Sequence, residues 1–206
     1  MFIMFDSKNV ACIFGWGNGI ILYMYEVELK VEVNTEEREK FLVQILERGF
    51  TQTENLVQND YYVEAEKSEY GGYDLKRFRD ESGTYFYTHK KWEVVDGYPV
   101  RNEDEREVTK EEFEVGISKE VKIHIQKNRM SLLGLYENRE IKIDMDTIKF
   151  DRSPNIRYFI EAEIITPEKT EVKSIKEFLD TFLKVVLEKE EIIHSPGMFT
   201  MAFERR

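Results

Sequence analysis

The sequence contains very little cysteine, since Cys12 is the only one among 206 residues. A single cysteine cannot form a disulfide within the chain, and it cannot build a zinc site from cysteine ligands. This cysteine usage fits a reducing compartment. We therefore predict a cytoplasmic protein without a cysteine-based metal centre.

A surplus of basic residues is also missing. Lysine and arginine number 30 against 41 aspartate and glutamate residues, which gives a formal net charge of −11. Proteins that bind duplex nucleic acid without sequence preference need a cationic surface. We therefore predict no duplex nucleic acid partner, although an acidic chain can still contain a local basic pocket.

No apolar stretch of the sequence is suited to crossing a membrane. The longest uncharged run, residues 9–25, contains three glycines and falls short of a spanning helix. No basic segment precedes it, which disfavours a signal peptide. We predict no membrane partner and treat residues 1–23 as an N-terminal extension of uncertain role. It is either sequence upstream of the true start at Met24 or an appended strand or tail.

Residues 24–206 contain no internal repeat, no low-complexity segment and no linker rich in proline or serine, so we predict a single domain. Its first strand is "YEVELKVEV", in which valine and leucine alternate with Glu26, Glu28 and Lys30. Short turns join most of the later strand-like runs, which favours antiparallel pairing. Eight such strands predict an α+β fold with a closed or nearly closed barrel. The later runs are residues 56–66, 73–80, 84–92, 97–108, 120–130, 139–148 and 156–165.

Helices are predicted where a capping residue is followed three positions later by glutamate. This spacing occurs at Asn34 with Glu37, Thr109 with Glu112, and Ser174 with Glu177. Apolar residues follow the first and third pairs at helical spacing. The tail, residues 194–206, shows no pattern.

Charged residues recur two apart within the predicted strands, so each set shares one face. A single set of this kind usually marks a solvated face, and an open sheet with one wet face remains the alternative. However, the carboxylates fall in the first and last strands and the cations between them. Arginine and lysine bind phosphate oxygens, and carboxylates hold hard divalent cations. The pattern predicts a cavity for a metal–polyphosphate complex. The later sets are Arg77 and Arg79; Lys90; Arg101, Glu103 and Glu105; Lys127 and Arg129; Asp144 and Asp146; and Glu161 and Glu163.

The order of these motifs resembles the CYTH family, also called triphosphate tunnel metalloenzymes, which includes class IV adenylyl cyclases and thiamine triphosphatase-like proteins. "EVELK" resembles the E-x-E-x-K signature that opens the family. "QNDYY", with Gln58, Asp60 and Tyr62, resembles its second strand. The strings "LKRFR", "THK", "RNEDE", "KNR", "MDTI" and "FIEAE" then follow in the family's order. The resemblance covers roughly residues 24–165 and the late helix.

The resemblance implies an eight-stranded antiparallel tunnel with helices packed on the outside, and it assigns roles to the charged residues. Glu26, Glu28 and Lys30 would be catalytic. Mg²⁺ or Mn²⁺ would be held by Glu26, Glu28, Asp146, Glu161 and Glu163, with Asp144 set aside in favour of Asp146. The triphosphate would be bound by Lys30, Arg77, Arg79, Lys90, Arg101, Lys127 and Arg129. Asp60, Glu103 and Glu105 would touch metal, pair with the arginines or anchor the structure.

The resemblance also implies a function. The first expectation is metal-dependent hydrolysis of a small-molecule triphosphate, namely ATP, thiamine triphosphate or tripolyphosphate. The alternative is a class IV adenylyl cyclase that makes cyclic AMP and pyrophosphate from ATP. A further alternative is a non-catalytic module that binds polyphosphate or a triphosphate end. A homodimer is considered as its assembly.

Overall fold

The computed structural model describes residues 25–69, 73–95, 98–118, 120–151 and 153–204, so the predicted extension at 1–23 lies outside the described residues. The described strands are β1 (Tyr25–Val33), β2 (Thr51–Lys67), β3 (Tyr73–Glu81), β4 (Thr84–Val95), β5 (Tyr98–Val108), β6 (Ile123–Tyr136), β7 (Arg139–Phe150) and β8 (Ile156–Thr166). The described helices are α1 (Thr35–Glu47), α2 (Lys110–Ile117), α3 (Val172–Leu187), which follows a short 3₁₀ turn at Lys169–Glu171, and α4 (Met198–Glu204).

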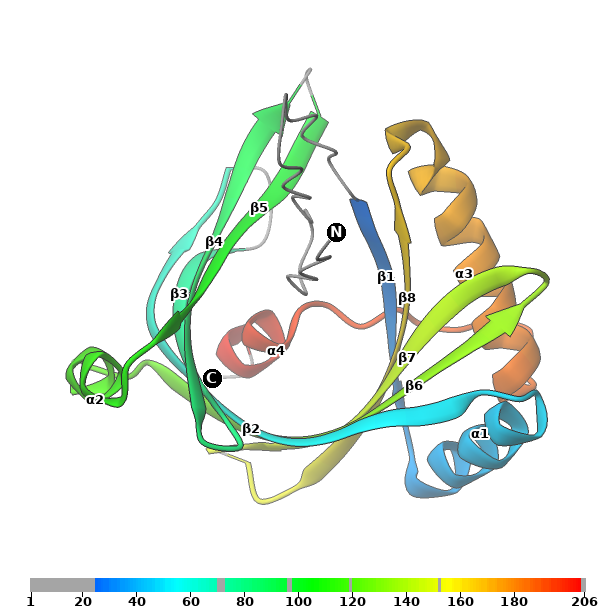
Figure 1. Cartoon of the computed structure of the whole chain (residues 1–206), viewed down its shortest axis with the longest axis horizontal. Helices are drawn as coiled ribbons and strands as arrows, with labels where there is room; N and C mark the ends of the chain where they lie inside the picture. Colours follow the sequence, from blue (N-terminus) through cyan, green and yellow to red (C-terminus); the bar gives the residue numbers. More distant parts are fainter. Residues whose placement is uncertain (1–24, 70–72, 96–97, 119, 152, 205–206) are drawn as a thin grey trace, which may run out of the picture.

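All eight strands belong to one sheet, in the order β1-β8-β7-β6-β2-β3-β4-β5. Every neighbouring pair is antiparallel. The sheet curls strongly, so that it has an outer convex face and an inner concave face (Figure 1). The prediction of eight antiparallel strands is confirmed. Within the described ranges no backbone pairing joins β1 to β5, so closure into a barrel stays a prediction.

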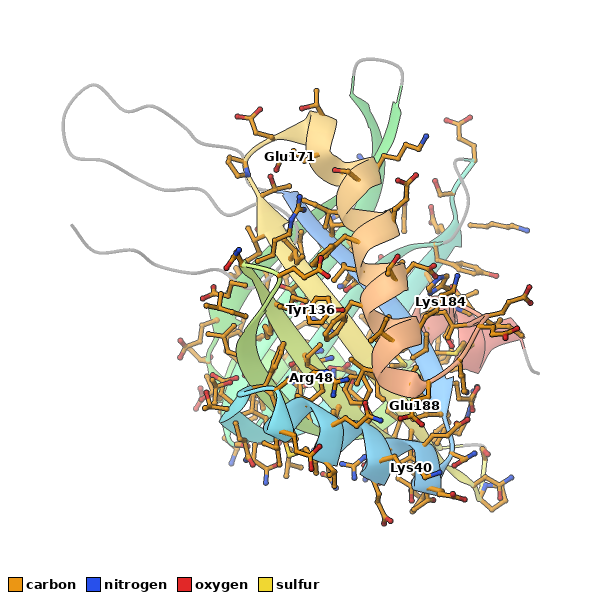
Figure 2. The ribbon with its side chains drawn as sticks, turned by 90° about the vertical axis from the view of Figure 1, so that its right-hand side faces the viewer. Lys40, Arg48, Tyr136, Glu171, Lys184 and Glu188 are labelled. Carbon is orange, nitrogen blue, oxygen red and sulfur yellow. The ribbon has the colours of Figure 1, made fainter. Side chains whose placement is uncertain are left out.

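The outer face of β1, β8, β7 and β6 carries the larger apolar core. Val27 and Val31, the apolar half of the β1 alternation, are buried there against α1 and α3. Phe41 of α1 and Phe182 of α3 are completely buried in the same core. Each such side chain contributes roughly 1.5–3 kcal/mol by leaving water. Figure 2 shows α3 and α1 lying over this face of the sheet.

Two of the predicted helix starts are confirmed, and one is wrong. Capping boxes are present at Asn34 with Glu37 and at Thr109 with Glu112. The third helix begins at Val172, ahead of Ser174, and its N-cap residue makes no side-chain cap. The 3₁₀ turn at Lys169–Glu171 leads straight into the helix, and the Ser174 hydroxyl donates back to the Glu171 carbonyl at 2.9 Å.

The tail, in which the sequence showed no pattern, contains α4. Its Phe199 ring lies 5.1 Å from the rings of both Tyr62 and Tyr73. Phe199 and Met201 belong to a second buried cluster with residues such as Phe159. This cluster lies on the concave side, and Figure 1 shows α4 inside the curve of the sheet, whereas the other helices are outside it. A helix this short depends on tertiary contacts, so local sequence does not predict it.

The segment that leads to α4 runs along the free edge of β1. His194 forms an isolated antiparallel bridge with Val31, and the Ser195 amide donates to the Lys30 carbonyl at 2.7 Å. The tail therefore satisfies backbone groups that an exposed sheet edge would leave open. None of the helices in the described part of the chain is long and apolar enough to cross a membrane.

Candidate functional site

Strand register brings the predicted acidic residues together on the concave face. Glu28 of β1 lies opposite Glu163 of β8, and Lys30 lies opposite Glu161. In turn, Glu161 lies opposite Asp144 of β7. Residues directly opposite one another share a face, with Cβ atoms roughly 5 Å apart. We call this surface the acidic wall, and it consists of Glu26, Glu28, Asp144, Asp146, Glu161 and Glu163.

The predicted cations occupy the same concave face on the neighbouring strands. Arg79 of β3 lies opposite Asp60 of β2, and Lys127 of β6 lies opposite Gln58. Arg77 lies opposite Thr88 of β4. We call this surface the basic wall, and it consists of Arg77, Arg79, Lys90, Lys127 and Arg129.

Most of the charged side chains on this face are buried, whereas Glu28 is exposed. Arg77, Lys127 and Glu161 expose only 3%, 6% and 6% of their surface, and Asp146 exposes none. Charged side chains are almost never this buried unless they are paired. These four side chains therefore do not belong to a solvated face, which was the alternative interpretation of the charge pattern.

Two aspartates hold three of the arginines in fixed positions. Asp60 accepts from Nε and Nη2 of Arg79 at 2.6 and 3.1 Å, and from Arg77 at 3.5 Å. Asp146 accepts from Nε and Nη2 of Arg129, both at 2.8 Å. Burial opposes ionisation of Asp60, but Arg77 and Arg79 outweigh it and hold its pKa well below the usual range. Burial likewise opposes ionisation of Asp146, but Arg129 and Lys127 outweigh it and lower its pKa, so both aspartates are ionised partners of arginine.

Arg77 also takes part in a hydrogen-bond network with Thr88 of β4 and Glu105 of β5. Its Nη2 donates to the Thr88 hydroxyl and to the Glu105 carboxylate, both at 2.9 Å. The Thr88 hydroxyl donates to Glu105 at 2.6 Å. Of the roles considered for Glu105 and Asp60, pairing with the arginines is the one that this geometry supports.

The basic wall is short of negative charge at Lys127. Its ion pair with Asp146 is long, at 4.0 Å. Burial, together with the positive charge of Arg129, lowers the pKa of Lys127 to about 7. An ammonium whose proton is held so weakly marks a place where an anion would be stabilised.

The acidic wall is short of positive charge. The Glu28 carboxyl contacts that of Glu161, whose negative charge raises the pKa of Glu28 to about 8. Lys30 pairs with Glu161 at 2.8 Å and partly offsets the repulsion. Glu163 contacts Glu26, and burial raises the pKa of Glu163. Glu28 itself is open to solvent, so this part of the wall is accessible.

The acidic wall offers the donor atoms that Mg²⁺ or Mn²⁺ prefers. Within the described residues no three carboxylate, histidine or cysteine side chains already have the arrangement of a bound ion. Lys30, Arg129 and Lys142 pair with carboxylates of this wall. Carboxyl groups in mutual contact, as at Glu28 and Glu161, need a proton or a cation between them. The oxygen donor set therefore fits a hard divalent ion.

Most of the predicted site residues meet on this face, and the exceptions lie on β4 and β5. Lys90 is half-buried and lies between Leu75 and Glu103 in the register. Arg101 of β5 lies opposite Trp92 of β4, and the side chains of Arg101 and Glu103 are outside the described set. Their predicted contacts stay predictions.

The sequence-based choice of Asp146 over Asp144 left out a second member of the wall. Asp144 accepts from the Ser131 hydroxyl at 2.5 Å, and it pairs with Nη1 of Arg129 at 2.6 Å. Lys142, which no motif had singled out, faces the same wall. The sequence did contain an indication of this, because Lys142, Asp144 and Asp146 are two apart and residues two apart on a strand share a face.

Comparisons with solved structures support the same fold. The PH1819 protein from Pyrococcus horikoshii OT3 is 21% identical, and the match covers 88% of this chain and 100% of that one with a TM-score of 0.60. HpAC1 from Hippeastrum, a candidate adenylyl cyclase described as having a dominant triphosphatase activity, is 16% identical over 88% and 96% of the chains, with a TM-score of 0.56. A candidate adenylate cyclase from Vibrio parahaemolyticus is 16% identical over 87% and 97%, with a TM-score of 0.57.

A search of curated proteins finds no significant match. The CYTH domain model, however, matches residues 24–194, which include all of the strands that build both walls. The chain therefore belongs to the CYTH family, whose members act on triphosphate substrates.

Proposed function

We propose that the protein is a divalent-metal-dependent triphosphatase that binds its substrate between the acidic and basic walls. One observation carries the proposal. Two surfaces on the same concave face of the sheet have opposite charge deficits, because Glu28 and Glu161 crowd negative charge while Lys127 lies among arginines. A complex of a divalent cation with a polyphosphate anion supplies both missing charges at once.

The acidic wall would hold the metal through Glu28, Glu161 and Glu163, with Glu26, Asp144 and Asp146 beside them. When bound, Mg²⁺ or Mn²⁺ would supply charge neutralisation and a more acidic water molecule. Lys30 keeps Glu161 oriented toward the cavity through their 2.8 Å ion pair. That pair also holds the pKa of Glu161 well below its usual range against the effect of burial.

The basic wall would hold the phosphate groups. Lys127 would gain most, since an anion beside it would offset both its burial and the charge of Arg129. Asp60 and Glu105 fix Arg77 and Arg79 before substrate binds, so little ordering is left to be done during binding. Lys90, Arg101, Arg129 and Lys30 complete the predicted set of cations.

Hydrolysis and cyclisation use the same two walls and differ in which phosphorus lies next to the nucleophile. Hydrolysis requires water at the terminal phosphate, and cyclisation requires the ribose 3′-hydroxyl at the α-phosphate. The dominant triphosphatase activity described for HpAC1, which shares the fold, supports hydrolysis as the first proposal.

We also propose a cytoplasmic location, on the single cysteine alone.

The experiment is a product analysis with tripolyphosphate, ATP and thiamine triphosphate, each with Mg²⁺ or Mn²⁺. The expected result is metal-dependent release of orthophosphate. Cyclic AMP with pyrophosphate would favour the cyclase instead, and a raised melting temperature without turnover would favour a binding module.

Glu28→Gln tests the metal assignment, with Glu111→Gln on the exposed part of α2 as its matched control. The first variant should fold and lose turnover, and the second should keep it. Full turnover in Glu28→Gln would contradict the proposed metal site.

A further inference from the structure

A lysine that the motifs do not contain lies within the acidic wall. Lys142 of β7 is opposite Glu163 in the register. Its Nζ lies 3.4 Å from Oδ2 of Asp144 and 3.7 Å from Oε2 of Glu163. Asp144 and Glu163 are both buried, whereas the Lys142 side chain is 33% exposed at the edge of the wall.

Lys142 is a charged partner of this wall. Its contacts with Asp144 and Glu163 give the ammonium a carboxylate partner on each side. Lys30 has the equivalent position on β1, where it pairs with Glu161 at 2.8 Å and exposes only 11% of its side chain. The contacts of Lys142 are longer and its ammonium is nearer to solvent. Of these two lysines, Lys142 lies where a soluble cation could take its place.

We propose that Lys142 occupies the place of a second divalent cation, so that the wall of this protein accepts one ion and not two. The inference rests on the proposed function, because it assumes that the wall binds a divalent ion. Six carboxylates are enough oxygen ligands for two such ions. The ammonium sits between Asp144 and Glu163, however, and a divalent ion placed there would meet strong repulsion at this range. The one ion would therefore bind next to Glu28, the exposed carboxylate of the wall, which contacts Glu161 and lies on β1, away from Lys142.

The consequence is a change in stoichiometry when the charge is removed. Lys142→Gln keeps most of the side-chain length and leaves Asp144 and Glu163 without this counter-charge. A second ion should then bind at least about tenfold more tightly than to the original protein, which corresponds to about 1.4 kcal/mol. Lys142→Arg keeps the charge and should keep a single ion.

The probe is MnCl₂ alone, and bound ions are counted by isothermal titration calorimetry and by the loss of the free Mn²⁺ signal in electron paramagnetic resonance. The matched control is Lys149→Gln, which removes the same charge from an exposed position of the same strand. We expect one bound ion for the original protein, for Lys142→Arg and for Lys149→Gln, and two for Lys142→Gln. Lys142→Met is a second neutral variant, and circular dichroism verifies that each variant is folded.

Two bound ions in the original protein would overturn the role of Lys142, whatever the variants do. One ion in both neutral variants would also overturn it, while leaving the proposed function intact. No binding of Mn²⁺ by any form would instead reject the metal-dependent function on which the inference rests. The three failures are therefore distinguishable without an activity measurement.

Discussion

Replacing Lys127 with methionine should stabilise the ligand-free protein while weakening its affinity for a triphosphate. Lys127 is 6% exposed, and its nearest described ion pair is 4.0 Å long. Methionine fills a similar volume without a charge. The gain in stability and the loss of binding have the same cause, which is an ammonium buried beside arginines with too little compensating negative charge.

The magnitude follows from the pKa of Lys127, which burial and the charge of Arg129 lower from 10.5 to about 7. A difference of one pKa unit corresponds to about 1.4 kcal/mol, so the charged form costs about 5 kcal/mol in the folded protein. A cost of this size is a large fraction of the net stability of a typical domain, which is roughly 5–15 kcal/mol.

The sign of the pH dependence is also determined. Between about pH 7 and pH 10.5 the unfolded chain binds a proton at Lys127 that the folded chain does not bind, so the stability of the original protein rises with pH. The destabilisation of the folded protein by the charge of Lys127 is complete below about pH 7 and disappears as pH rises through 10.5. The advantage of Lys127→Met should therefore be about 5 kcal/mol at pH 6 and about 2 kcal/mol at pH 9.

The assay is urea denaturation of both proteins at pH 6, 7, 8 and 9, together with tripolyphosphate binding by calorimetry. Lys149→Met, on the same sheet but exposed, should change the free energy of unfolding by less than about 0.5 kcal/mol at every pH. A Lys127→Met protein that is less stable than the original at pH 6, or whose advantage does not decline with pH, would refute the reasoning.

Two further predictions concern the supports of the site. Asp60→Asn should lower the free energy of unfolding by about 3–5 kcal/mol in urea titrations, because Arg77 and Arg79 lose a buried carboxylate partner. An unchanged urea midpoint would mean that other groups already compensate the charges of both arginines. Phe199→Ala should cost about 3 kcal/mol, because the ring leaves its contacts with Tyr62 and Tyr73, and amides of α4 should exchange faster with deuterium. Unchanged exchange in α4 would show that the helix is held by other contacts.

Local periodicity explains which parts of the fold were predictable. A strand repeats every two residues, so the split of β1 into Val27 and Val31 on one face and Glu28 and Lys30 on the other is written in its own sequence. Helix capping at Asn34 is likewise a matter of neighbouring residues. The start of α3 was misplaced because a 3₁₀ turn, and not a side-chain cap, precedes it.

The partners within the site could not be predicted in the same way. Asp60 and Arg79 are on strands joined by a turn, but Arg129 meets Asp146 and Glu161 because β6, β7 and β8 are neighbours in the sheet. Whether a carboxylate binds a metal or an arginine depends on which cation the register places opposite it. Parity places Asp144 and Lys142 on the charged face of β7, but their partners depend on the neighbouring strands, since Asp144 meets Arg129 of β6 and Lys142 meets Glu163 of β8.

The sequence by itself determined the strands, two of the helix caps and the presence of acidic and basic strand faces, because these depend on residues a few positions apart. Only the tertiary structure decided that both kinds of face lie on one concave surface and that α4 packs inside the curve of the sheet (Figure 1). It also decided that Lys142 stands among the carboxylates. The physical reason is that burial and charge pairing are set by the curl and register of the whole sheet, which no single strand specifies.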